Sequence, residues 1–348
     1  MDYLLLVFIT AACISLFSIP ALIKVAILKR LFDAPDGERK VHNRIVPTVG
    51  GIIIFAATLF SYALWYPVVD AHDLKYITAT SLLLFFVGIK DDIIGTAPIK
   101  KLLSFIIISF ILVLLANQRI TSMHGIFGIY AMTNAWQILF STFTVIVIIN
   151  AFNLIDGIDG LAAGIGLIAC CTLGAWFYLV QDASMAALAF ALAGSLAAFL
   201  VFNFAPAKLF MGDSGSLIIG LIISILVIRC INYDVGKIQH NQLVTFSRPV
   251  FVLSILVYPL YDTFRVFLLR ILRGESPFTA DKKHIHHALL SLGCSHRTTT
   301  LILYAFTLII ISISLLLHAQ STLVQFVCVL LATIVIAQLP FFIKRRNA

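Results

Sequence analysis

The chain has 348 residues, of which 61% are hydrophobic and 11% are charged, and its mean hydropathy is +1.05. This composition excludes a soluble globular domain and indicates a protein whose main solvent is lipid. The net charge of +8 raises the question of nucleic acid, but the basic residues form no long run. We therefore expect no nucleic acid as a partner, and instead a lipid bilayer and phosphorylated substrates.

Apolar stretches of roughly membrane-spanning length predict about eleven transmembrane helices. They cover residues 3–28, 49–66, 76–89, 102–116, 136–149, 161–180, 184–202, 216–231, 250–271, 299–317 and 322–343. The stretches at 76–89 and 136–149 are the shortest, but without either one neighbouring polar loops would lie on opposite sides of the membrane. We expect an all-α, polytopic integral membrane protein that forms a single domain over residues 1–348.

The distribution of Lys and Arg predicts the orientation, because cytoplasmic loops carry an excess of them. With the C-terminus in the cytoplasm, seventeen basic residues fall in cytoplasmic loops and five in outer loops. An odd number of spans then places the N-terminus outside. The cytoplasmic loops are expected at about 29–48, 90–101, 150–160, 203–215 and 272–298, and their polar motifs at one membrane face predict one shared site.

The first two of these loops carry basic and acidic motifs. Lys40 and His42 belong to the first, and Asp91 and Asp92 follow the third span. Two carboxylates at the negative end of a helix dipole are unfavourable unless a cation compensates them. Lys101 or a divalent cation could do so, although an isolated acidic pair could also be ordinary solvated charge.

The loop at 150–160 carries the strongest motif. Asn150, Asn153, Asp156 and Asp159 recur at a spacing of three, which would stack them on one face of a helical turn. Oxygen donors at this density suit Mg²⁺, with Mn²⁺ as an alternative. A glycine-rich turn capped by Asn and Asp is the competing interpretation, but capping needs one such residue rather than four.

The last two loops contain a possible helix start and three histidines. Asp213 or Ser214 could simply cap the eighth span, or the helix N-terminus could hold a phosphate beside a carboxylate that shares the metal. His284, His286 and His287 could form a zinc site or a solvated basic loop. No Cys or acid at suitable spacing supports zinc, so we favour donors for a diphosphate.

These five motifs, in this order, resemble the polyprenyl-phosphate N-acetylhexosamine-1-phosphate transferases, and the match runs from about Asp33 to His287. The sequence is most similar to the branch that uses undecaprenyl phosphate and N-acetylglucosamine. That branch reads His-Ile-His-His at the position of His284 to His287, whereas the peptidoglycan-precursor branch has three consecutive histidines. The departure argues against a muramoyl-pentapeptide substrate.

The resemblance implies a magnesium-dependent enzyme of the bacterial inner (cytoplasmic) membrane with its active site facing the cytoplasm. It would transfer N-acetylhexosamine 1-phosphate from a UDP-sugar to undecaprenyl phosphate and release UMP, as the initiating step of envelope glycan synthesis. The resemblance assigns catalytic roles to Asp91, Asp92, Asp156, His284, His286 and His287, substrate binding to Lys40, His42, Lys101, Asp159 and Arg273, and the metal to Asn153, Asp156 and Asp213. A homodimer is compatible with the sequence.

Several alternatives stay open on sequence alone. The acceptor phosphate could attack the UDP-sugar directly, or Asp91 or Asp92 could first form a covalent intermediate. A transporter would place ionisable groups near the membrane midplane, where the candidates are Lys24, Asp262 and Arg265, the last two spaced to pair on one helix face. A CDP-alcohol phosphotransferase would need its own spaced acidic motif, which is not found here. The sequence does not decide which N-acetylhexosamine is used.

Overall fold

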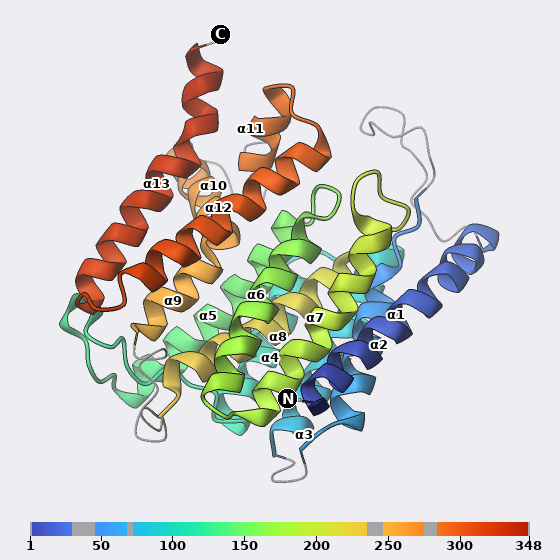
Figure 1. The fold of residues 1–348 in the computed structure, drawn as a ribbon, viewed down its shortest axis with the longest axis horizontal. Coiled ribbons are helices and arrows are strands. Elements are labelled where there is room, and N and C mark those ends of the chain that lie inside the picture. The colour runs from blue at the N-terminus through green and yellow to red at the C-terminus, as the bar shows by residue number, and fades with distance from the viewer. Residues whose placement is uncertain (1, 30–45, 68–71, 235–245, 275–283, 347–348) are drawn as a thin grey trace.

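The computed structural model describes residues 2–29, 46–67, 72–234, 246–274 and 284–346, and these residues form helices without any strand (Figure 1). The first half of the chain contains α1 (Asp2–Leu28), α2 (Gly50–Leu64), α3 (His72–Ile94), α4 (Pro98–Phe110), the π-helical turn η1 (Ile111–Leu115), the short η2 (Ile126–Gly128) and α5 (Asn134–Ile155). The second half contains α6 (Leu161–Leu179), α7 (Ala183–Asn203), α8 (Asp213–Asn232), α9 (Arg248–Ile255), α10 (Val257–Leu272), α11 (Ile285–Ser291), α12 (His296–Leu316) and α13 (Thr322–Arg346).

The prediction of an all-helical membrane protein is confirmed, but the number of eleven spans is not. Within the described ranges, eight helices are long and apolar enough to cross a membrane, or nine if the pair α9 and α10, bent by 77°, is one span. Helix α2 has 15 residues, about 22 Å at 1.5 Å per residue, against a hydrocarbon core of about 30 Å. Helix α3 carries charged residues near both of its ends, which shortens its apolar part.

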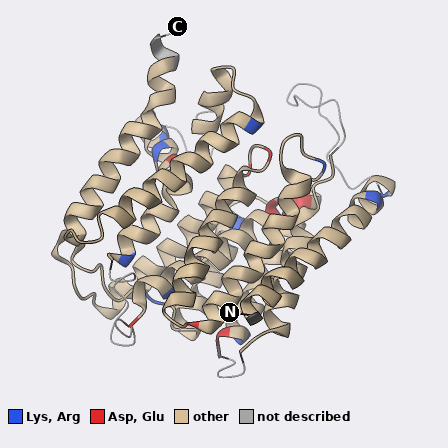
Figure 2. Ribbon diagram, viewed as in Figure 1, with Lys and Arg blue, Asp and Glu red and all other residues tan. Residues whose placement is uncertain are grey.

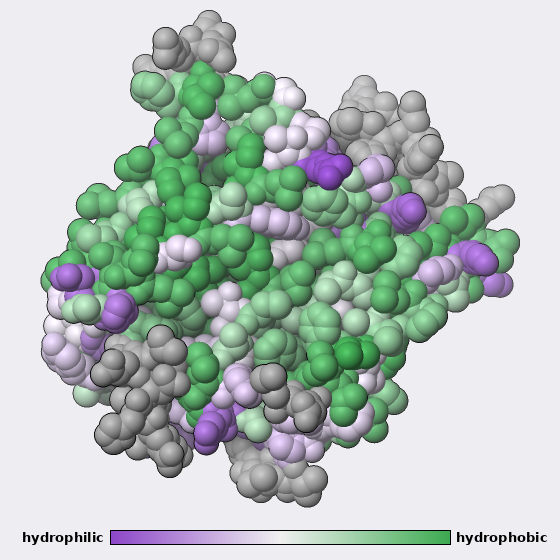
Figure 3. All heavy atoms as spheres, in the orientation of Figure 1, coloured by the Kyte–Doolittle hydropathy of each residue, from purple (hydrophilic) through white to green (hydrophobic). Residues whose placement is uncertain are grey.

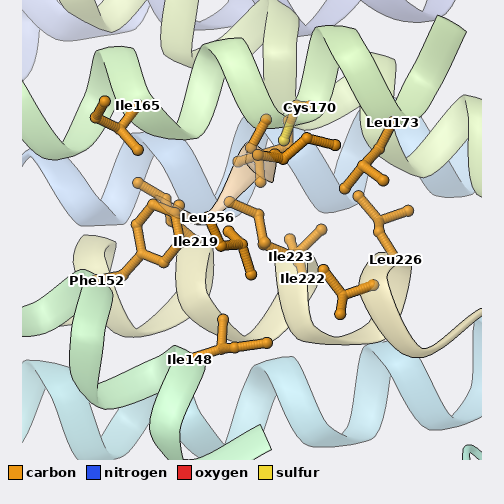
Figure 4. Packing of buried hydrophobic residues seen from close by; sticks show 14 of the residues in the cluster. Ile148, Phe152, Ile165, Cys170, Leu173, Ile219, Ile222, Ile223, Leu226 and Leu256 are labelled. Carbon is orange, nitrogen blue, oxygen red and sulfur yellow. The ribbon is translucent and has the colours of Figure 1, made fainter. Parts of the chain in front are cut away.

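Helix α8 lies at the centre of the bundle. Its residues from Ser214 to Ile231 are buried except for Arg229, and α2, α3, α5 and α6 pack around it. Figure 4 shows Ile148 and Phe152 of α5 pointing toward the Ile219 and Ile222 side of α8. A helix that is apolar on all sides is stable only when it is surrounded, so α8 provides a fixed axis for its own N-terminus.

The outer surface of the bundle is apolar. Large hydrophobic side chains such as Phe17 and Leu28, each 81% exposed, point away from the protein, and Figure 3 shows that hydrophobic residues dominate the visible face. Exposed apolar area on this scale indicates contact with lipid.

Most charged residues lie toward the two ends of the bundle (Figure 2). One end combines the C-terminal ends of α3, α5 and α10 with the N-terminal ends of α8 and α12. The described parts of the motif loops at 90–101, 150–160, 203–215 and 272–298 meet at this end. The motif Arg39 to His42, and with it the predicted substrate-binding residues Lys40 and His42, lies outside the described residues.

Candidate active site

The site is built on the N-terminus of α8, which close helix packing holds in place. A Cβ atom on Gly51 of α2 would lie 2.2 Å from the amide nitrogen of Gly215, and one on Gly88 of α3 would lie 2.4 Å from the Cα of Ser214. Both distances are far below van der Waals contact, so only glycine permits this approach. The Gly51 amide also donates to the carbonyl of Met211 at 2.8 Å. Asp213, the first residue of α8, is thereby fixed.

Asp213 belongs to an acid–amide cluster, which we define as Asp91, Asn153 and Asp213 gathered around the ammonium group of Lys101. Lys101 Nζ donates to Asp91 Oδ2 at 3.1 Å and to Asn153 Oδ1 at 3.1 Å, and it also contacts Asp213 Oδ2. Asn153 Nδ2 donates to Asp213 Oδ1 at 2.8 Å. Three helices, α3, α5 and α8, therefore bring oxygen atoms to one point, and the Lys101 ammonium group of α4 stabilises them there.

Asp92 has a different role from its neighbour Asp91. Its two carboxylate oxygens accept hydrogen bonds from the backbone amides of Asp213 at 2.6 Å and Ser214 at 3.0 Å. The carboxylate thus satisfies amides at the start of α8 and lies at the positive end of the helix dipole. The alternative that Asp213 or Ser214 caps its own helix is wrong. The N-cap residue of α8 is Gly212, at a φ of +74°, and it has no side chain that could accept a hydrogen bond from the first turn.

Asp156 follows α5 and its half-buried carboxylate makes no hydrogen bond within the described residues. Burial and the nearby carboxylates of Asp213 and Asp92 together raise the pKa of Asp156 to about 8. Burial is the larger cause, and the neighbouring carboxylates add to it. A divalent cation would relieve the repulsion between these carboxylates.

The residues present fit a hard cation in their chemistry, since carboxylate and amide oxygens are the ligands that Mg²⁺ binds. However, among the described residues no three acidic, histidine or cysteine side chains converge on a single point. Asn153 and Asp213 are in contact through their side chains, whereas the carboxylate of Asp156, the third predicted ligand, makes no hydrogen bond to either of them. Magnesium stays a prediction.

Asp159 is 4% exposed and connects three segments of the chain. Its Oδ2 accepts the amide of Ala207 at 3.0 Å, and its Oδ1 lies 3.7 Å from His296 Nδ1. The backbone carbonyl of Asp159 accepts from Thr300 at 2.9 Å. Asp159 therefore ties the loop after α5 to the loop after α7 and to the start of α12, and its role in substrate binding stays a prediction.

The histidine cluster, His284, His286 and His287, lies on and before the short helix α11. Asp262 of α10 is fully buried and orients it: Asp262 Oδ2 lies 2.9 Å from His284 Nδ1, and Oδ1 accepts the amide of Ile285 at 2.9 Å. A carboxylate only accepts, so His284 Nδ1 carries a hydrogen and Nε2 is left for a ligand.

The second histidine of the cluster, His286, lies between Tyr258 of α10 and the loop after α5. The hydroxyl of Tyr258 lies 3.1 Å from His286 Nδ1, and a Cβ atom on Gly157 would lie 3.1 Å from His286 Nε2. Burial, with the charges of His287 and His284, lowers the pKa of His286 well below its usual range. His286 is therefore a neutral imidazole that can donate or accept a hydrogen bond.

A cavity of about 1170 Å³ opens between the two clusters and extends along the helices. At its polar end it is lined by Asp91, Lys101, Asn153, the histidine cluster and Arg270. The remainder is lined mainly by apolar side chains, among them Phe105, Phe143, Phe264, Phe267, Phe326 and Leu330. One continuous space therefore has phosphate-binding groups at one end and an apolar wall along its length.

Comparison with known proteins agrees with this geometry. Residues 74–231 match the model of glycosyl transferase family 4. The chain is 30% identical over 302 residues to the Bacillus subtilis (strain 168) "Probable undecaprenyl-phosphate N-acetylglucosaminyl 1-phosphate transferase", which covers 85% of this chain and 80% of that protein. The chain belongs to glycosyl transferase family 4. Its resemblance to the polyprenyl-phosphate N-acetylhexosamine-1-phosphate transferases is thereby confirmed.

Two further relatives of this glycosyl transferase have a similar coverage. The "Undecaprenyl-phosphate alpha-N-acetylglucosaminyl 1-phosphate transferase" of Yersinia pestis is 30% identical over 84% of this chain and 77% of its own length. The "Decaprenyl-phosphate N-acetylglucosaminephosphotransferase" of Mycobacterium leprae (strain TN) is 30% identical over 86% of this chain and 80% of its own length. The family match contains the acid–amide cluster, while the histidine cluster lies beyond its end at residue 231.

Arg270 was not among the residues predicted for the site of this glycosyl transferase, Asp262 was named only as a possible partner of Arg265, and one predicted residue lies apart. Asp262 and Arg270 both face the site from α10, and Arg270 is 2% exposed. Arg273, the predicted diphosphate ligand, is exposed at the end of α10 and does not line the cavity among the described residues. Asp262 and Arg270 could have been found from the sequence, because charged residues inside an apolar span are rare and usually functional.

Proposed function

We propose that this chain transfers N-acetylglucosamine 1-phosphate from UDP-N-acetylglucosamine to undecaprenyl phosphate and releases UMP, as the first step of an envelope glycan. The names of the relatives support the sugar and the polyprenyl class of acceptor. One relative is named for decaprenyl phosphate, so the names agree on a polyprenyl phosphate acceptor and differ in its length.

The observation that carries the proposal is the shape and lining of the large cavity. An enzyme that joins a soluble sugar nucleotide to a lipid phosphate needs a polar site that continues into an apolar groove. The cavity has this form, since Lys101 and the histidine cluster lie at one end and phenylalanine and leucine side chains line the rest. A cation channel or transporter would instead need polar groups along its whole path.

In the proposed reaction, an oxygen of the acceptor phosphate attacks the sugar-proximal phosphorus of the UDP-sugar. The bond from that phosphorus to the oxygen of UMP breaks, and UMP leaves with the electron pair. A phosphate monoester has its second pKa near 6, so the acceptor is mostly a dianion at neutral pH and needs little help from a base. Positioning and charge neutralisation are then the main tasks of the protein.

The two carboxylates of α3 serve by position rather than as nucleophiles in this proposal. Asp91 contacts Lys101, and Asp92 accepts two amides of α8. A nucleophilic Asp92 would have to give up both amides before it could reach phosphorus. His286 and Arg270 face the cavity as donors for the diphosphate oxygens, while His284 Nε2, with the hydrogen on Nδ1, can accept a hydrogen bond from a substrate hydroxyl.

Mg²⁺ would be held by the side chains of Asn153 and Asp213. The charge of Asp213 acts on Asp156, so Asp156 is the third candidate ligand. The bound cation would neutralise charge on the diphosphate as UMP departs. Lys101 supplies positive charge in the same cluster. It can therefore keep the carboxylates together before the cation binds.

We further propose eleven spans, with the N-terminus outside and the site in the cytoplasm, from the excess of Lys and Arg in the loops at the site's end. Single cysteines at Ala97 and Ala319 lie at opposite ends of the bundle. The first should react with an impermeant thiol reagent only from the cytoplasmic side, and the second only from outside. The reverse pattern would refute this orientation.

The experiment that tests the function uses purified protein in detergent with undecaprenyl phosphate, Mg²⁺ and a panel of UDP-sugars. Mass spectrometry of the lipid should show a product heavier by one N-acetylhexosamine phosphate with UDP-N-acetylglucosamine. A product with another sugar of the panel but not with this one would correct the substrate. No lipid product with any sugar would refute the proposed activity.

A further inference from the structure

A second cavity, of about 370 Å³, lies at the end of the bundle opposite the active site. It forms where α8 and α12 end, where α9 and α13 begin, and beside the connection between η1 and α5, which lies against the turn from α12 to α13 (Figure 1). Its polar lining includes Ser122, His124, Ser247, Arg248 and Gln325. No described lining residue is acidic.

Arg248 supplies the positive charge of this cavity and is 7% exposed. It donates to the carbonyl of Tyr233 and lies 3.3 Å from His124 Nδ1. His124 Nε2 lies 2.9 Å from the carbonyl of Ile231, so Nε2 carries the hydrogen and Nδ1 accepts from Arg248. Burial and the Arg248 charge lower the pKa of His124. The carboxylate whose charge acts on Arg248 is that of Asp234, which does not line the cavity.

Two buried oxygen atoms in the same cavity wall have no hydrogen-bond partner among the described residues. Gln325, 1% exposed, donates through Nε2 to the carbonyls of His318 at 3.2 Å and Gln320 at 2.9 Å. These two bonds fix the amide, so that Oε1 points the other way, and it is unsatisfied. Ser247 Oγ is also unsatisfied. More than 90% of buried polar groups have a partner, so this wall indicates a ligand that donates hydrogen bonds.

The cavity also lies at the depth of lipid headgroups, because the membrane helices around it begin and end there. Phe127 and Tyr130 beside it are 71% and 73% exposed, and Phe127 packs edge-on against Phe326 of α13 at 5.6 Å. Exposed aromatic rings at helix ends are typical of the boundary between hydrocarbon and headgroups.

We propose that this cavity binds the headgroup of an anionic phospholipid, with its phosphate against Arg248 and its headgroup hydroxyls against Gln325 Oε1 and Ser247 Oγ. Phosphatidylglycerol has this chemistry, since it combines one phosphodiester with two free hydroxyls. A zwitterionic phosphatidylcholine offers the phosphate but no hydroxyl donor. The site is independent of the transferase reaction at the other end of the bundle.

The test is native mass spectrometry of the delipidated protein in detergent, with phosphatidylglycerol, phosphatidylcholine or glycerol 3-phosphate added separately. Phosphatidylglycerol should be retained, and Arg248→Gln should weaken its binding by about tenfold or more, since it removes a charge-assisted hydrogen bond. Ser247→Ala should weaken it by a smaller factor. This variant should leave the fold intact because Ser247 Oγ makes no hydrogen bond among the residues that the structure describes.

Lys75→Gln is the matched control, because Lys75 is an exposed cation at the same end of the bundle and outside the cavity. It should bind phosphatidylglycerol like the unchanged protein. Equal retention in Arg248→Gln and Ser247→Ala would overturn the proposal, and so would equal binding of both lipids. Binding of glycerol 3-phosphate without phosphatidylglycerol would assign the cavity to a soluble phosphate ester and overturn the lipid assignment.

Discussion

The acid–amide cluster and the histidine cluster face the same cavity, yet different forces hold them. In the first, Asp91, Asn153 and Asp213 are on long helices and converge on Lys101, so like charges are held together by a cation. In the second, the imidazole groups are on a seven-residue helix, and Asp262 and Tyr258 orient them. One cluster is fixed by helix packing and the other by side-chain partners.

This difference predicts how substitutions in each cluster affect folding and catalysis. Removing charge from the acid–amide cluster should leave the fold intact and affect chemistry directly, because the glycines of α2 and α3 hold α8 in place. Removing an orienting partner from the histidine cluster should act indirectly, through the imidazole that it positions.

The largest effect is expected for Asp213→Asn. We expect turnover to fall by about 10²-fold to 10³-fold, because the amide removes a charge that the transition state needs. The apparent requirement for Mg²⁺ should also rise, and a chelator should abolish activity of the unchanged protein until Mg²⁺ is restored. Steady-state assays across a Mg²⁺ titration measure both quantities.

Asp73→Asn is the control for this change, since Asp73 is a half-buried carboxylate at the opposite end of the bundle, near Arg229. It should keep its activity. Full activity of the unchanged protein in excess chelator would remove the metal from the mechanism.

An intermediate effect is expected for Asp262→Asn. The amide has one acceptor oxygen where the carboxylate has two, so either His284 Nδ1 or the Ile285 amide loses its partner. We expect kcat/KM to fall by about 10-fold to 100-fold, the usual range for a residue that orients a ligand group. In a His284→Gln background the same change should have almost no further effect. Additive losses would show that Asp262 does not act through His284.

The smallest effect is expected when the substitution of Arg270 is compared with that of Arg273, the residue at the C-terminal end of α10. Arg270→Gln should lower kcat/KM by about tenfold or more, because Arg270 lines the cavity and charge-assisted hydrogen bonds are strong. Arg273→Gln should change it by about twofold or less, as is usual for an exposed charge. Arg270→Lys keeps the buried charge and controls for folding. A larger loss at Arg273 than at Arg270 would support the assignment that rests on the family resemblance.

The helices could be predicted because each is an apolar run, and every predicted range coincides with a helix or with the bent pair α9 and α10. The bend itself lies at Leu256, three residues before Pro259, whose ring and missing amide hydrogen disfavour a continuous helix through the preceding turn. Hydropathy alone does not show whether the short α2 crosses the membrane.

The partners of the site residues could not be predicted, because they depend on contacts between distant helices. Local spacing suggested that Asp262 pairs with Arg265, but Asp262 contacts His284, and the Arg265 guanidinium lies 3.6 Å from the centre of the Phe341 ring. Likewise, nothing in the sequence near Asp92 shows that it accepts the amides of α8, 121 residues further along the chain.

The central claim is that the carboxylates of α3 position charge and do not attack phosphorus. The most direct measurement is rapid-quench UMP release from enzyme and UDP-N-acetylglucosamine without polyprenyl phosphate. We expect no burst of UMP, and release only after the acceptor is added. A burst stoichiometric with enzyme, accompanied by a labelled sugar phosphate on the protein and lost in Asp91→Asn or Asp92→Asn, would contradict the account.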